Sequence, residues 1–206
     1  MRSCALVSAL CCLPGLAVAD ACRDEIVALM QGVLDPMNRP PHIQTTVVYN
    51  PDGSVKWDLV SLVETPLRTI SGQPSSNWFT MAIDTQVWNG PSAEGPWTAS
   101  AAGMPEGRAE AMAEDQLEMI ASLTDTECLG PDDAGNTRYV YRAQTMPDET
   151  GAYFGSLDTV TVDAASGQVI LFDRTEFVNS WSEGVSMERW VSEVVFDDAV
   201  KVNPPE

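Results

Sequence analysis

The sequence predicts an α+β fold in which an antiparallel β-sheet is covered by helices. Strand-like segments follow one another through short turns, and short turns join antiparallel neighbours, whereas parallel strands need long crossovers. Only two segments repeat apolar residues at helical spacing. A sheet of about nine strands covered by two helices is therefore the expected layer arrangement.

The first predicted helix lies near the start of the chain and ends before Pro36. Asp24 and Glu25 are expected in its first turn, where the helix dipole favours carboxylates. Its apolar positions are Ile26, Leu29, Met30, Val33 and Leu34. The second helix is expected over residues 106–123. Its apolar stripe consists of Ala109, Ala113, Leu117 and Ile120.

The strands are predicted from β-branched and aromatic runs bounded by turn residues, such as Asn50-Pro51-Asp52-Gly53. The expected strands cover residues 43–49, 55–64, 67–71, 78–88, 137–144, 157–162, 168–177 and 186–196, with a further hairpin arm at Trp97. The segment 78–88 alternates clearly between apolar and polar residues. Its alternation predicts that Phe79, Met81, Ile83 and Val87 face the helices, and that Thr80, Asp84 and Gln86 face solvent.

Residues 1–19 are typical of a cleaved signal peptide. A basic start at Arg2 precedes an uncharged apolar stretch, and Ala17-Val18-Ala19 is a small-x-small cleavage site. The stretch is too short to cross a bilayer of about 30 Å, which disfavours a membrane anchor. A lipid-anchored start is disfavoured because Cys22 lacks a suitable preceding motif. We expect residues 20–206 to form one exported domain without a transmembrane helix.

Two cysteines remain after cleavage, Cys22 and Cys128, and an oxidising compartment favours their pairing. This disulfide would close a loop of more than a hundred residues and stabilise the fold by about 4–5 kcal/mol. Two buried free thiols are the alternative. We expect no metal site, because two cysteines and one histidine, His42, are too few for a closed zinc site.

The charge of the chain excludes some partners. Loss of Arg2 with the signal peptide changes the formal charge from −19 to −20. Nucleic acid requires clustered basic residues, and only Lys56 and Lys201 supply ammonium groups. We therefore expect neither nucleic-acid binding nor stable association with anionic membranes. The acidity is typical of a surface adapted for solubility.

The order of elements resembles the LolA-like family of periplasmic lipoprotein and lipid carriers. The resemblance rests on the helix after the signal, the Trp88–Trp97 hairpin with the second helix directly after it, and the late hairpin 159–170. It implies a strongly curved antiparallel sheet, a half-barrel whose concave face is closed by the helices. It also implies a space between sheet and helices that holds acyl chains.

The sequence contains no common catalytic or phosphate-binding motif. A catalytic triad could only use His42, and its place after two prolines predicts an exposed residue without a catalytic role. The pairs Asp132-Asp133 and Asp197-Asp198 lack the spacing of a calcium loop. We therefore expect neither an enzyme nor a resident cofactor.

The leading hypothesis is a periplasmic carrier that shelters a lipid or an acylated chain, such as that of a lipoprotein, and acts as a monomer. Its movable edge is expected at residues 37–42, where prolines leave few backbone hydrogen bonds. The expected cavity lining is Leu29, Met30, Val33, Phe79, Met81, Ile83, Leu117 and Ile120. The alternative is a non-catalytic envelope interaction module with a filled core. A hydrolase is a third and weaker hypothesis, and secretion is the alternative to a periplasmic location.

Overall fold

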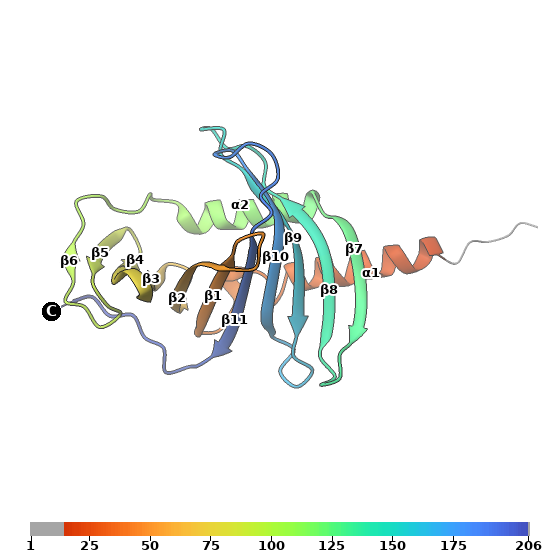
Figure 1. Cartoon of the computed structure of the whole chain (residues 1–206), viewed down its shortest axis with the longest axis horizontal. Helices are drawn as coiled ribbons and strands as arrows, with labels where there is room; N and C mark the ends of the chain where they lie inside the picture. Colours follow the sequence, from red (N-terminus) through yellow and green to blue (C-terminus); the bar gives the residue numbers. More distant parts are fainter. Residues whose placement is uncertain (1–14, 206) are drawn as a thin grey trace, which may run out of the picture.

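The computed structural model describes residues 15–205, with side chains from residue 21 onward. All its strands belong to one antiparallel sheet of eleven strands, which is not closed (Figure 1). The first six strands are β1 (His42–Tyr49), β2 (Val55–Thr65), β3 (Arg68–Gln73), β4 (Trp78–Ile83), β5 (Gln86–Gly90) and β6 (Thr98–Ala99). The other five are β7 (Thr124–Pro131), β8 (Thr137–Gln144), β9 (Phe154–Val162), β10 (Val169–Asn179) and β11 (Arg189–Phe196).

The strand order is β6-β5-β4-β3-β2-β1-β11-β10-β9-β8-β7. Each half of the sheet is thus a meander whose strands are neighbours in the sequence, and the halves join where β1 pairs with β11. The predicted turn at Gly53 is confirmed, since Asn50 N–H donates to Ser54 O at 2.8 Å and Gly53 has a φ of 84°. Short connections of this kind explain why the antiparallel class was predictable.

Two α-helices, α1 (Gly15–Met30) and α2 (Arg108–Ala121), accompany the sheet, with short 3₁₀ turns η1 (Pro36–Asn38) and η2 (Pro74–Ser76). The curved α+β class is confirmed. The predicted signal peptide lies outside the described residues up to residue 14, and its last residues form the start of α1. Figure 1 shows these first turns extending past edge strand β7. Because α1 starts early, Asp24 and Glu25 lie within the helix and not in its first turn.

The predicted strand 78–88 is two strands, which corrects the position of Val87. Asp84 adopts a φ of 52° and turns the chain, so that Met81 pairs with Trp88 and Ala82 pairs with Val87. Cross-strand partners share a face, and Trp88 therefore lies on the same face as Met81 while Val87 lies on the other. Phe79, Met81 and Ile83 are buried as predicted, and Asp84 and Gln86 are exposed.

The segment after α2, for which the sequence predicted no strand, forms edge strand β7. Its pairing with β8 is interrupted by two register shifts, and most of its side chains are exposed. An edge strand of this kind lacks the alternation that marks a half-buried strand. Cys128 therefore lies on a strand, and its disulfide with Cys22 joins α1 to the edge of the sheet.

The disulfide itself is confirmed, with a Cα–Cα distance of 5.7 Å between Cys22 and Cys128. This separation lies within the range that a disulfide can bridge without backbone movement. The consequence for the helices differs from the expectation. The disulfide does not connect the two helices with each other. It holds α1 against β7, and neither of its cysteines lies in α2.

The main core lies between α1 and the strands β8–β11. Ile26 and Met30 of α1 are fully buried against Val160 and Phe172 of the sheet. Met119 and Ile120 of α2 only pack against the margin of this cluster, and no residue of α2 is fully buried. Apolar contact with the sheet therefore holds α1 more firmly than α2.

The segment 37–42 is tied to its surroundings more closely than its prolines predict. The Arg39 guanidinium donates to Val33 O at 3.4 Å and to Leu34 O at 2.8 Å, and Asp197 N–H donates to Pro41 O at 3.0 Å. His42, expected to be exposed, is buried at 3% exposure, with Nδ1 2.8 Å from Pro40 O. These contacts contradict the expected movable edge.

Candidate functional site

The eight residues predicted to line one cavity are divided between two apolar clusters. Met30 belongs to the main core, and Leu29, Val33 and Ile120 pack against it. Phe79, Met81 and Ile83 form a second cluster with Ile70 and Val202. Leu117 belongs to neither cluster and is 65% exposed.

The sheet register places these two clusters on opposite faces of the sheet. Met81 pairs with Ile70, Ile70 with Leu62, and Leu62 with Ile43 on β1. The main core lies on the face of Thr46. Thr46 pairs with Ser192 on β11, and Ser192 pairs with Phe172 of the main core on β10. Ile43 and Thr46 are three positions apart on one strand, so their side chains point to opposite faces.

The second cluster is covered by the C-terminal segment and not by a helix. Val202 is completely buried there, its N–H donates to Glu64 Oε2 at 3.0 Å, and its carbonyl accepts from Arg68 Nη2 at 2.6 Å. The expectation that Phe79, Met81 and Ile83 face the helices is therefore wrong. The structure does not gather the eight predicted residues around one space.

A cleft that the sequence reasoning missed lies between α2 and two of the strand connections. Its volume is about 550 Å³. The lining residues come from α2, from the β8–β9 connection with the ends of its strands, and from the β10–β11 connection. They are Ala111, Glu114, Asp115, Glu118, Thr145, Met146, Pro147, Asp148, Glu149, Ala152, Tyr153, Phe154 and Trp181.

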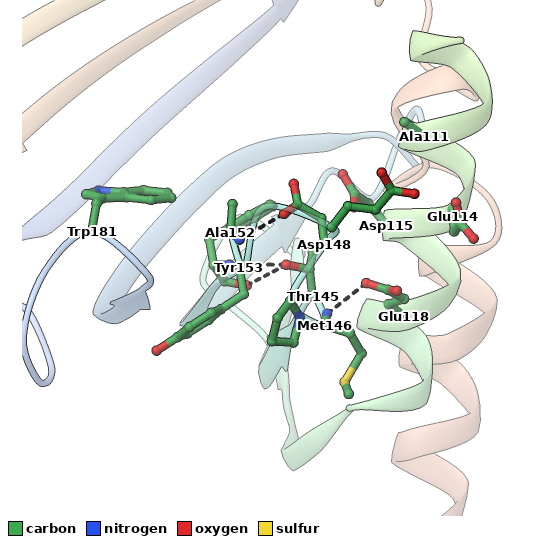
Figure 2. Close-up of a pocket in the computed structure, with 13 residues that line it drawn as sticks. Ala111, Glu114, Asp115, Glu118, Thr145, Met146, Asp148, Ala152, Tyr153 and Trp181 are labelled. Atoms are coloured by element: carbon green, nitrogen blue, oxygen red, sulfur yellow. Dashed lines mark hydrogen bonds between the residues drawn. The ribbon is translucent and has the colours of Figure 1, made fainter.

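One side of this acidic cleft is negatively charged. Glu114, Asp115 and Glu118 come from successive turns of α2, and Asp148 and Glu149 come from the β8–β9 connection. Figure 2 shows the three α2 carboxylates on one side and Trp181 on the other, with Asp148 and Tyr153 from the connection between them. No lysine or arginine lines the cleft. Its field therefore favours a cationic ligand.

Three large apolar side chains that line the acidic cleft are exposed to solvent. Trp181 is 73% exposed, Met146 60% and Phe154 45%. Large apolar side chains that gather at one exposed site mark an interaction surface more often than isolated ones do. The cleft thus combines aromatic contact area with negative charge.

Hydrogen bonds hold the acidic cleft in shape. Glu118 Oε2 accepts from Met146 N–H at 2.7 Å, which connects α2 with the β8–β9 connection. Asp148 Oδ1 accepts from the N–H of Thr150 at 2.7 Å and from that of Ala152 at 2.9 Å. Ser180 N–H donates to Tyr153 O at 3.2 Å, which places the β10–β11 connection beside the β8–β9 connection.

The carboxylates of the cleft have opposite pKa shifts. Partial burial raises the pKa of Asp115, and the nearby carboxylates of Glu118, Asp148 and Glu114 raise it further. The pKa of Asp148 is lowered, chiefly by the hydrogen bond from the Thr150 hydroxyl and then by the backbone N–H of Ala152. Within the described part of the chain, no group of three or more His, Cys, Asp or Glu side chains is placed to hold a metal ion.

These shifts predict opposite effects of two similar substitutions. A raised pKa means that charged Asp115 opposes folding at pH 7, so Asp115→Asn should stabilise the protein by up to about 0.5 kcal/mol after solvent screening. This gain should disappear below the unfolded-state pKa of about 3.9. Asp148→Asn should destabilise at pH 7, and that loss should disappear as the pH falls through the lowered pKa of Asp148. Urea unfolding of both variants between pH 3 and 7 tests the prediction, and effects of equal sign would contradict it.

No protein-family model matches the chain, and no curated protein matches it. Among solved structures, it is similar to a chain of the complex structure of Pseudomonas aeruginosa MucA/MucB, with a TM-score of 0.40 and 14% sequence identity over 89% of this chain and 61% of that chain. It is also similar to a chain of the crystal structure of MucB in complex with MucA(peri), with a TM-score of 0.32 and 14% identity over 91% of this chain and 60% of that chain. The chain spans about three fifths of the length of these matches. Similarity this low carries no argument about function or partners.

No helix within residues 15–205 is both long enough and apolar enough to cross a membrane.

Proposed function

We propose that this protein is an exported, non-catalytic interaction module, periplasmic or secreted, that acts as a monomer. Its binding site in this proposal is the acidic cleft of α2. The occupant is a segment of a partner protein that carries basic and apolar residues. The observation that carries the proposal is the combination of five carboxylates with exposed Trp181, Phe154 and Met146, without a basic residue in the lining.

The geometry supports this function better than the carrier function that the sequence favoured. A carrier needs an apolar space between sheet and helices, and the residues expected to line it pack on opposite faces of the sheet. Met30 is 1% exposed and Met81 3% exposed, each within a cluster of other buried side chains. Filled clusters of this kind favour the interaction module over a lipid or lipoprotein carrier.

The charge pattern determines which partner segment fits. Carboxylates along α2 attract lysine or arginine side chains and speed their encounter with the cleft. Trp181 offers a large, rigid surface for an apolar anchor, and residues of this type dominate binding energy at many interfaces. Binding should therefore weaken as the salt concentration rises. It should not be lost completely at high salt, because the apolar contact with Trp181 is not screened.

Site-specific photo-cross-linking in the envelope tests this function. A photo-reactive phenylalanine derivative at position 181 should give a discrete protein adduct. The same group at Val195, which is exposed on β11, serves as the matched control and should give none. With the partner identified, Trp181→Ala should weaken binding by about 2 kcal/mol, roughly 30-fold. Identical adducts from both positions, or none from position 181, would contradict the proposal.

A further inference from the structure

The strands β1–β6 have one face without a single charged side chain. These strands contain four charged residues, Lys56, Asp58, Glu64 and Arg68. Lys56 and Asp58 alternate along β2 with Trp57 and Leu59, which lie on the other face. Arg68 pairs with Ile83, and Glu64 binds Val202, so both belong to the side of the second apolar cluster. All four charges thus lie on the same side as that cluster.

We call the opposite side the uncharged face, defined by a row of hydroxyl and amide side chains in register across six strands. The row consists of Gln44, Ser61, Ser71, Thr80, Asn89 and Thr98. Neighbouring strands are about 4.8 Å apart, so the row extends over roughly 24 Å. In a chain with 30 acidic residues, a face of this size without charge is conspicuous.

The side chains of this row retain unused hydrogen-bonding capacity. The Ser71 hydroxyl donates to Ser61 Oγ at 2.8 Å, which leaves the hydroxyl hydrogen of Ser61 free to donate. The Thr80 hydroxyl donates to Asn89 Oδ1 at 3.2 Å, which leaves both amide hydrogens of Asn89 free. Asn89 and Thr98 are exposed, and the row is partly exposed between them and Gln44. A ligand with its own hydroxyl groups could use these donors and acceptors.

The chemistry of the row selects among ligands. An acyl chain would displace the water that is hydrogen-bonded to these hydroxyls and would offer no hydrogen bonds in its place, which costs free energy. A charged ligand would find no partner of opposite charge on the strands. A neutral chain rich in hydroxyl groups meets neither penalty. Trp78 lies on the same face as Thr80 and is 51% exposed, so it supplies a flat surface for stacking against a sugar ring.

We propose that the uncharged face binds a neutral glycan chain, which lies across the strands along the row from Gln44 to Thr98. The sugar rings of an extended glycan are spaced at an interval similar to the distance between neighbouring strands, about 4.8 Å. Successive rings can therefore contact successive strands. This site is separate from the acidic cleft and does not depend on the protein-binding function proposed for it.

The test uses three uncharged hexasaccharides as probes, chitohexaose, cellohexaose and maltohexaose, with the full domain in calorimetric titrations. At least one should bind, and Trp78→Ala and Ser71→Asp should each weaken its binding at least tenfold. Trp181→Ala removes an even more exposed tryptophan outside the face and should leave glycan affinity unchanged. Amide chemical shifts should change along β3, β4 and β5 on addition of the bound probe.

Each other outcome overturns the assignment. The assignment is wrong if none of the three glycans binds the wild type at millimolar concentration. It is also wrong if a bound glycan has the same affinity for Trp78→Ala as for the wild type. Uptake of a fluorescent fatty acid that Ser71→Asp abolishes, without glycan binding, would identify the face as a lipid site instead. If Ser71→Asp does not fold, the smaller change Thr80→Ala at the centre of the row replaces it, and this variant should also bind the glycan more weakly than the wild type.

Discussion

Replacement of both Cys22 and Cys128 by alanine is expected to lower the free energy of unfolding by about 4–5 kcal/mol. The disulfide joins residues 106 positions apart in the sequence, and a long closed loop removes much conformational entropy from the unfolded chain. It also fastens α1, which contributes Ile26 and Met30 to the main core, to edge strand β7. Loss of the bond therefore affects the most buried part of the fold.

Guanidinium chloride unfolding of the oxidised wild type and of the double variant measures this effect. The wild type kept under reducing conditions is the control and should unfold with the double variant. The amide hydrogens of α1 should exchange faster in the double variant and in the reduced wild type, because the disulfide no longer opposes local opening of the helix. A difference below about 1 kcal/mol would show that the loop is already constrained in the unfolded chain.

Phe172→Ala is expected to cost about 3–5 kcal/mol, the range for removal of a buried phenylalanine side chain. Phe172 is 2% exposed at the centre of the main core. The guanidinium carbons of Arg39 and Arg174 lie 4.9 Å and 4.8 Å from the centre of its ring. The substitution thus leaves a cavity and also removes the aromatic surface that both cations contact.

Arg39 adds to this effect because it is charged in a poorly solvated place. Burial and the neighbouring Arg174 lower the pKa of Arg39 to about 10, so the guanidinium stays protonated at pH 7. Phe154→Ala makes the same chemical change at a residue that is 45% exposed, and it should cost far less. Thermal unfolding of both variants gives the comparison. Similar costs at the two positions would show that the ring of Phe172 can be replaced by repacking.

Much of the fold could be predicted from local patterns. The turn at Gly53 requires a residue that accepts a positive φ, and the alternation from Phe79 to Ile83 requires one buried face. The two cysteines that follow the predicted signal peptide are sufficient to predict a disulfide, because residues 20–206 contain no third thiol. Each of these predictions depends on neighbours in the sequence or on elimination, and each is confirmed.

The errors arise where a feature depends on contacts between distant segments. Val87 was placed on the wrong face because the two-residue turn at Asp84 interrupts a pattern that is continuous in the sequence. Strand β7 was not predicted, because an exposed edge strand has no apolar periodicity. The C-terminal segment after Phe196 has no apolar periodicity, yet its residue Val202 is fully buried among the side chains of the second cluster.

The sequence by itself determined the α+β class, most of the strands, the disulfide and the general acidity, because these follow from periodicity, turn chemistry and composition. Only the tertiary structure decided which face of the sheet each apolar residue occupies, because that depends on the register of strands far apart in the chain. It therefore also decided that Met30 and Met81 belong to separate clusters. The acidic cleft likewise exists only because three segments with no common pattern, α2 and the connections that carry Asp148 and Trp181, come together at one end of the sheet.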